Sequence, residues 1–235
     1  LTALVVGGLL YGTTASAADL TEPLTPSDPA VSGDTYTLED YEERTITKSS
    51  YSEGIHKVPY KFSALTNYIG KVGDKHTFRD FTIDLNGNEL TLNVVSKDNG
   101  GGPATTVAAI FAGPENNLTV TDSSGGGKLF INAEAENKAS YVDGIHVERP
   151  IASEHGSATV NFEAEEGVEI SSVQHHGTGA ARGVFADDRA QVNFKKLTIY
   201  GVESAGDEEN VSGVYLAGDE SSITIDEADI SGVKG

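Results

Sequence analysis

"GVFADDRAQVNF" (residues 183–194) has a simple order: a short apolar strand, a polar corner and a second short strand. The same order recurs in "GVYLAGDESSITI" (residues 213–225) and in "AIFAGPENNLTV" (residues 109–120). A fourth apolar strand of the first kind, "GIHV", lies at 144–147. Recurrence of one supersecondary unit along a chain is the sequence signature of a repeat architecture.

The spacing of the second strand in each unit gives the repeat length. These strands begin at Leu118, Val160, Val192 and Ile223, which are separated by 42, 32 and 31 positions (160 − 118, 192 − 160 and 223 − 192). A third series, at 168–170, 197–199 and 228–230, is spaced by 29 and 31 positions. The chain therefore repeats three short strands with a period near 31 residues.

Each strand alternates apolar and polar residues, so one side of it is buried and the other is exposed. Such a unit buries its apolar side by stacking on the next one, at the strand spacing of about 4.8 Å. The pattern predicts an all-β, right-handed parallel β-helix, because the alternative of a β-sandwich does not explain a recurring three-strand order. The predicted core ladders are Ile110, Ile145, Val184 and Val214, and Leu118, Val160, Val192 and Ile223.

The pair Asn86-Gly87 lies between two alternating apolar segments. This chemistry is typical of a two-residue β-hairpin, which would be antiparallel. The alternative is a corner that turns the chain between two sheets of one coil. We favour the corner.

The composition excludes several classes of function. The chain has 36 acidic against 16 basic residues, for a formal net charge of −20. Nucleic acids and anionic membrane surfaces both require a basic surface, so neither is an expected partner. The chain has no cysteine and no Asp-x-Asp-x-Asp-Gly loop, so we expect no disulfide, no thiolate metal site, no calcium loop of that type and no cofactor.

The chain divides into three parts. Residues 1–17 have an apolar run followed by Ala15-Ser16-Ala17, the pattern of a secretory signal peptide that is truncated at its start. Residues 18–79, whose first part is rich in Pro, Ser, Thr and Asp, are interpreted as an N-terminal linker or cap segment. Residues 80–235 are predicted to form about four to five coils that continue beyond this sequence.

The stretch "FTIDLNGNELTL" (residues 81–92) resembles the opening coil of pectate-lyase-like parallel β-helices. Together with the signal peptide, the acidity, the lack of cysteine and the Gly-rich coils, it makes the chain similar to the adhesin-type passenger domains of autotransporters. The resemblance implies secretion to a bacterial cell surface, association with the outer membrane, and a host or neighbouring-cell glycan or protein as partner. It also implies a C-terminal outer-membrane barrel, which this sequence lacks. The sequence does not indicate an oligomeric state.

Two clusters have residue types that also occur in catalytic or metal sites. Asp187 and Asp188 would be the acid pair of a polysaccharide lyase or glycoside hydrolase on this fold. They align, however, with the polar corners of the sister repeats, so we interpret them as a turn. His175 and His176 lack zinc-motif spacing, and we interpret them as a solvated loop pair.

The middle position of the first strand in each unit carries a ring in every repeat. Because its neighbours are assigned to the core, alternation points these side chains outward, in a strip that stacks coil on coil. Exposed rings bind sugar faces and apolar partners. The alternatives are that the rings only stabilise the sheet or are covered by a loop such as 148–157. The candidate ligand-binding residues are Phe111, His146, Phe185 and Tyr215.

These features favour a secreted, surface-displayed adhesin or scaffold that is not an enzyme. A polysaccharide lyase or glycoside hydrolase on the same fold is the first alternative, and a purely structural spacer is the second.

Overall fold

The structure of the protein is a computed structural model. It describes residues 19–20, 24, 34–48, 61–67, 79–97, 106–113, 116–136, 141–148, 158–206 and 211–235. These residues form strands, turns and short connections only. No helix among them is long and apolar enough to cross a membrane. The predicted signal peptide, residues 1–17, lies outside the described part of the chain.

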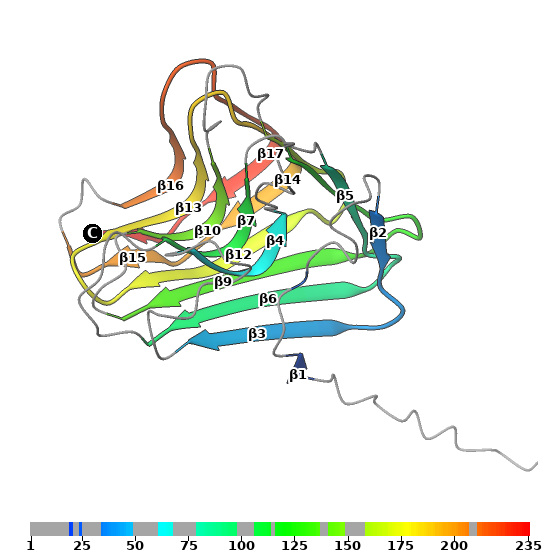
Figure 1. The fold of residues 1–235 in the computed structure, drawn as a ribbon, viewed down its shortest axis with the longest axis horizontal. Coiled ribbons are helices and arrows are strands. Elements are labelled where there is room, and N and C mark those ends of the chain that lie inside the picture. Colours follow the sequence, from blue (N-terminus) through cyan, green and yellow to red (C-terminus); the bar gives the residue numbers. More distant parts are fainter. Residues whose placement is uncertain are drawn as a thin grey trace, which may run out of the picture.

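The strands lie on three faces, and every pair of neighbouring strands is parallel (Figure 1). The first face contains β2 (Asp34–Thr37), β5 (Arg79–Asp84), β8 (Asn116–Thr121) and β11 (Thr159–Phe162). The second contains β1 (Asp19–Leu20), β3 (Glu42–Lys48), β6 (Glu89–Ser96), β9 (Lys128–Ala135) and β12 (Val168–His175). The third is a separate five-stranded sheet of β4 (Lys61–Asn67), β7 (Thr106–Ala112), β10 (Tyr141–Val147), β13 (Ala180–Ala186) and β16 (Val211–Leu216).

Two long strands join the first and second faces. β14 (Gln191–Ile199) pairs with β11 through Phe194 and with β12 from Leu197 onward. β17 (Ser222–Ile230) follows β14 along its whole length, and β15 (Val202–Ser204) and β18 (Val233–Lys234) extend the second face. The two faces are therefore one 13-stranded sheet. The predicted parallel β-helix is confirmed.

The repeat length follows from the register of the first face. Phe162 pairs with Phe194 and Phe194 with Ile225, which gives repeats of 32 and 31 residues (194 − 162 and 225 − 194). The preceding repeats, measured from Tyr36 to Ile83 to Val120 and on to Phe162, are longer, at 47, 37 and 42 residues (83 − 36, 120 − 83 and 162 − 120). The period near 31 thus holds for the last two repeats only.

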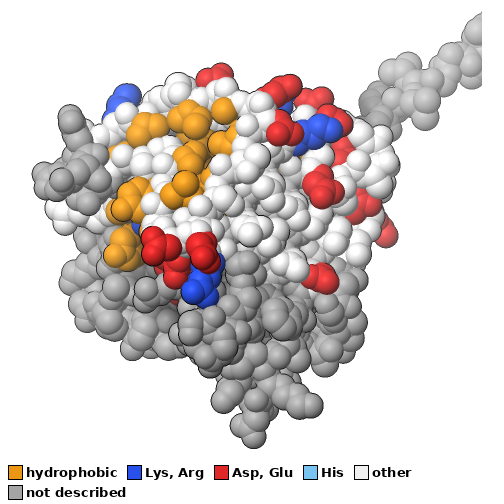
Figure 2. Space-filling view, turned by 90° about the horizontal axis from the view of Figure 1, so that it is seen from above, with side chains coloured by type: hydrophobic (Ala, Val, Ile, Leu, Met, Phe, Trp, Pro, Cys, Tyr) orange, Lys and Arg blue, Asp and Glu red, His pale blue; other side chains and the backbone are white. Residues whose placement is uncertain are grey.

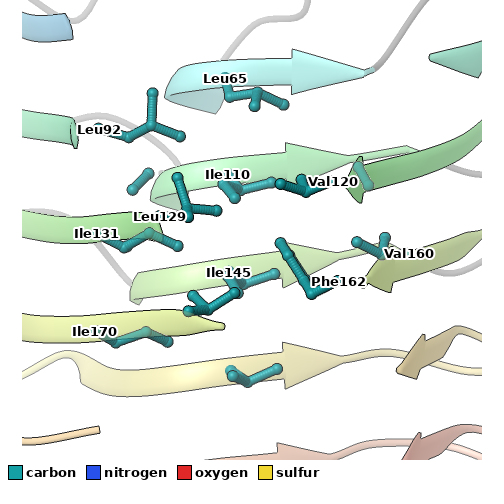
Figure 3. Close-up of a cluster of buried hydrophobic side chains, with 14 of the residues drawn as sticks. Leu65, Leu92, Ile110, Val120, Leu129, Ile131, Ile145, Val160, Phe162 and Ile170 are labelled. Carbon is teal, nitrogen blue, oxygen red and sulfur yellow. The ribbon is translucent and has the colours of Figure 1, made fainter. Parts of the chain in front are cut away.

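The interior contains the predicted ladders, together with residues of the second face. Ile110, Ile145, Val184 and Val214 are in register on the third face. Leu118, Val160, Val192 and Ile223 are in register on the first. Figure 3 shows the side chains of successive coils above one another in the interior. Each fully buried aliphatic side chain of this kind contributes about 1.5–3 kcal/mol to stability.

The glycine at the start of "GIHV", "GVFA" and "GVYL" has a structural cause. A Cβ on Gly144 would lie 2.6 Å from the Gly183 carbonyl oxygen and 3.0 Å from Ile170 Cγ2. One coil later, a Cβ on Gly183 would lie 2.5 Å from the Gly213 carbonyl oxygen and 2.9 Å from Ile199 Cδ1. An isoleucine of the second face therefore fills the space that a side chain here would need.

The turn at Asn86-Gly87 is a corner between β5 and β6, as predicted. Both residues have positive φ, 50° and 79°. β5 and β6 each pair with strands of other coils, so no hairpin forms. The Asp84 carboxylate accepts hydrogen bonds from the backbone N–H of Asn86 (3.0 Å) and of Ser123 in the next corner (2.9 Å).

The solenoid begins before the predicted boundary at residue 80. β2, β3 and β4 pair in parallel with β5, β6 and β7, so the described strands of the predicted linker form a regular coil. The sequence conceals this coil because two of its inward positions are polar: Glu42 and Arg44 pair with Leu90 and Leu92. Tyr36 donates a 2.5 Å hydrogen bond to Glu42, whose carboxylate also contacts Arg44. A polar network thus replaces part of the apolar core here, while Ile46 and Leu65 remain in it.

The last described coil exposes apolar side chains. β16, β17 and β18 each have a strand partner on one side only among the described strands. Figure 2, seen from above Figure 1, shows a band of apolar side chains with acidic groups at its border. The exposed large apolar residues of these strands are Tyr215, Leu216, Ile230 and Val233.

Candidate functional site

The four predicted ring-position residues form one continuous stack across the third face. Phe111, His146, Phe185 and Tyr215 are in register on β7, β10, β13 and β16. The ring centroids are separated by 5.0 Å, 4.7 Å and 5.8 Å in that order. These distances are those of favourable aromatic contacts, so the predicted coil-on-coil stacking is confirmed.

The exposure of this stack differs from the prediction. Phe111, His146 and Phe185 are only 2%, 7% and 7% exposed, and Tyr215 alone is open, at 46%. None of the four belongs to the apolar core cluster, so they are buried on the outer side of the sheet. The prediction of an exposed four-ring strip is therefore wrong for three of its members. Residues 149–157, most of the loop considered as a cover, lie outside the described part.

An interruption of the side-chain alternation in β10 brings two polar side chains together beside the stack. Pairing with β13 runs through Asp143, passes over Gly144 and resumes at Ile145. Asp143 and His146, three residues apart, consequently lie on the same side of the strand, with Asp143 Oδ2 2.7 Å from His146 Nδ1. On β13, Arg182 donates from Nε to Asp143 Oδ1 (2.6 Å) and from Nη2 to Oδ2 (2.9 Å).

The electrostatics of this ion pair favour the charged form. The side chain of Asp143 is fully buried and that of Arg182 is 8% exposed. Burial raises the pKa of Asp143, but the charge of Arg182 and the hydrogen bond and charge of His146 outweigh it, and the pKa is lowered. Asp143 is therefore ionised at neutral pH, and it fixes the Arg182 guanidinium bidentately.

The guanidinium of Arg182 is also surrounded by rings. Its Cζ lies 3.7 Å from the ring centroid of Phe185, 4.6 Å from that of Tyr141 and 5.7 Å from that of Tyr215. Tyr141 is 40% exposed and Tyr215 is 46% exposed. We call Tyr141, Arg182, Phe185 and Tyr215 the Arg182 ring cluster. It presents two exposed tyrosines around a fixed cation, which is an arrangement that stacks against sugar rings or apolar groups.

The sequence alone does not single out Asp143, Arg182 or Tyr141. The available signal is the repeat alignment, in which Asp143 and Arg182 occupy the same position, three residues before the ring position. Two opposite charges directly opposite each other on neighbouring strands indicate a cross-strand ion pair.

Asp187 and Asp188 form the predicted turn. The backbone N–H of Ala190 donates to the Asp187 carbonyl oxygen (2.9 Å), and the N–H of Asp188 donates to the Asp187 carboxylate (2.8 Å). The next corner lies directly against this one, since a Cβ on Gly218 would be 2.7 Å from Asp188 Cβ. The two carboxylates thus belong to a stacked corner.

The prediction of a solvated loop pair is confirmed for His176, which is exposed and follows β12, and is wrong for His175. His175 ends β12, is 2% exposed, and accepts a hydrogen bond at Nδ1 from the Gly177 N–H (2.9 Å). His176 Nε2 lies 2.8 Å from Glu134 Oε1. Among the described residues, no group of three or more His, Cys, Asp or Glu side chains is placed to hold a metal ion.

We compared the chain with protein-family models, with curated proteins and with solved structures. None matches.

Proposed function

We propose that this protein is a secreted binding protein of the adhesin type, displayed at a bacterial cell surface, which contacts a host or neighbouring-cell ligand through the Arg182 ring cluster. The observation that carries the proposal is the pair of exposed tyrosines held around a buried Arg–Asp ion pair. Secretion, the outer-membrane barrel and the autotransporter route belong to the proposal on the basis of the sequence resemblance alone.

The cluster has the properties of a preorganised contact surface. Tyr141 and Tyr215 offer large, rigid rings that lose little conformational entropy on binding. Arg182 is held by Asp143 and by the Phe185 ring, so its position does not have to be selected when a ligand binds. Both tyrosines lie on parallel strands of a packed solenoid rather than on a loop.

The proposal is tested by attachment of the purified chain to bacterial and epithelial cells and to a glycan array. Loss of a central aromatic contact costs about 2 kcal/mol, so we expect Tyr141→Ala and Tyr215→Ala each to weaken binding roughly thirtyfold. Tyr200→Ala is the matched control, because Tyr200 is also 40% exposed but lies outside the cluster.

Cell attachment that survives in the Tyr141→Ala/Tyr215→Ala double variant would contradict the proposal. Turnover of a polysaccharide by the purified chain would support the lyase or hydrolase alternative. Absence of attachment to every surface, with the fold intact by circular dichroism, would support the spacer alternative.

A further inference from the structure

A groove of about 350 Å³ lies on the outer side of the first face, on other strands than those that carry the ring stack. Three successive strands, β11, β14 and β17, contribute to it. Its lining residues are Asn161, Phe162, Glu163, Asn193, Phe194, Lys195, Thr224 and Asp226.

The groove follows from the order of side chains along each strand. Asn161, Asn193 and Thr224 are in register and form an outward column of short side chains across three coils. Two residues further along each strand, a second column of charged side chains stands beside it. The short column forms the floor and the charged column forms a wall, so the groove crosses the strands and runs parallel to the solenoid axis.

The floor is an oriented amide ladder. Asn193 Nδ2 donates to Asn161 Oδ1 at 2.8 Å, and Phe162 and Phe194 stack at 4.7 Å on the inner side of the same strands. In this pair, the Asn161 amide N–H groups and the Asn193 amide oxygen are directed away from the shared bond. The floor therefore offers donors and acceptors together, with the Thr224 hydroxyl as a third group that does both.

The wall determines which charge the groove accepts. It contains the carboxylates of Glu163 and Asp226 and one cation, Lys195, whose ammonium already contacts Glu165. The chain as a whole carries a formal charge of −20. A phosphate, sulfate or uronate would meet net repulsion here, whereas a ligand with uncharged hydroxyl groups, each a donor and an acceptor, matches both floor and wall.

We infer that this groove binds an uncharged oligosaccharide chain, laid along the solenoid axis over the Asn161–Asn193–Thr224 floor. The site is separate from the Arg182 ring cluster and does not depend on the function proposed for that cluster.

The test uses fluorescently labelled, uncharged hexasaccharides of glucose, mannose, galactose and N-acetylglucosamine, with hexagalacturonate as the acidic counterpart of the galactose probe. Binding to the full chain is followed by fluorescence anisotropy. We expect saturable binding of at least one uncharged probe and weaker binding of hexagalacturonate. Asn193→Ala removes the central floor amide, and the loss of its hydrogen bonds should weaken binding about tenfold.

The chain offers a closely matched control. On the second face, Asn132 Nδ2 donates to Asn93 Oδ1 at the same distance of 2.8 Å. Asn132→Ala therefore removes the donor of an equivalent cross-strand amide pair outside the groove, and it should leave the binding constant unchanged. A common loss of binding in both variants, with unchanged circular dichroism, would place the effect in the scaffold and overturn the inference.

A second variant tests the charge argument. Asp226→Asn keeps the shape of the wall and removes one negative charge, so binding of hexagalacturonate should strengthen several-fold while that of the uncharged probe changes little. The inference is overturned if no uncharged probe binds, if Asn193→Ala binds like the wild type, or if hexagalacturonate binds most tightly. Tyr141→Ala/Tyr215→Ala separates the two sites: it should abolish cell attachment and leave anisotropy binding intact.

Discussion

Arg182→Met removes the charge that neutralises Asp143 and keeps an unbranched apolar side chain against the surrounding rings. The Asp143 side chain is fully buried, and it loses two hydrogen bonds, of 2.6 Å and 2.9 Å. The contact with His146 Nδ1 remains. An uncompensated buried carboxylate is the main consequence of the substitution.

Breaking a buried ion pair from one side typically costs about 3–5 kcal/mol. Because His146 still hydrogen-bonds the carboxylate, we expect the lower end, about 3 kcal/mol at pH 7. Removing both charges in Asp143→Leu/Arg182→Met eliminates the unpaired charge, so this double variant should lie within about 1 kcal/mol of the wild type.

The loss of stability in Arg182→Met should also depend on pH. In the wild type the pKa of Asp143 is lowered, so the ion pair stabilises the fold above the unfolded-state value of about 4 and this contribution disappears as the pH falls through the folded-state value. In Arg182→Met the lowering of the Asp143 pKa by the arginine is lost, so the carboxylate is protonated at a higher pH and protonation relieves the cost. The difference in the free energy of unfolding between the wild type and Arg182→Met should therefore be largest at neutral pH and shrink below about pH 4.

Urea unfolding followed by far-ultraviolet circular dichroism at pH 7 and pH 3 measures these differences. A loss below about 1 kcal/mol at pH 7 would refute the assignment of a tightly coupled pair, since that is the range of exposed salt bridges. A double variant no more stable than Arg182→Met would show that packing around the guanidinium, not charge, is the source of the effect.

Three further substitutions test the packing and the corners by the same urea method. Phe194→Ala removes a 2%-exposed ring that stacks on Phe162 at 4.7 Å, and the cavity should cost about 3–5 kcal/mol; a loss below 1 kcal/mol would contradict this packing. Gly183→Ala places a Cβ 2.5 Å from a carbonyl oxygen of the next coil and should lower the free energy of unfolding by more than about 2 kcal/mol. In Gly125→Ala the new Cβ meets no atom within 4 Å, so this variant should lose about 1 kcal/mol through its φ of +78° alone. Equal losses of stability in the two variants would argue against close approach of the coils. Burial raises the pKa of Asp84, but hydrogen bonds from the two corners lower it more. Asp84→Asn should therefore destabilise the fold at pH 7, by less than about 1 kcal/mol because the carboxylate is only partly buried, and this loss should shrink as the pH falls below about 4.

The inward-facing side chains of this fold could be predicted from the sequence because their positions depend on one rule. Alternation assigns every second side chain to the interior, and a repeat places like residues in register. The ladders containing Val160 and Val184 and the corner at Asp187-Asp188 followed from that rule. The first coil did not, because Glu42 and Arg44 occupy inward positions and satisfy each other's charge there.

The exposure and the contacts of the outward-facing side chains could not be predicted from alternation. Outward from the core is not the same as exposed to solvent, as the 2% and 7% exposures of Phe111 and Phe185 show. The interruption at Gly144, which places Asp143 beside His146, breaks the alternation within one strand.

The strand register also distinguishes residues that the β-helix fold requires from residues that are specific to the Asp143–Arg182 site. The column that holds the ion pair contains Ser63, Ala108, Asp143, Arg182 and Ser212 in successive coils. A feature required by the β-helix would recur in each coil, as the small residue at the Gly144 position does. The charges occur in two adjacent coils only, and small or polar residues occupy the same position elsewhere. The ion pair is therefore not a condition of the fold, which is why removing both charges should preserve stability. By the same reasoning, the double variant should lose attachment through the Arg182 ring cluster while it keeps the solenoid intact.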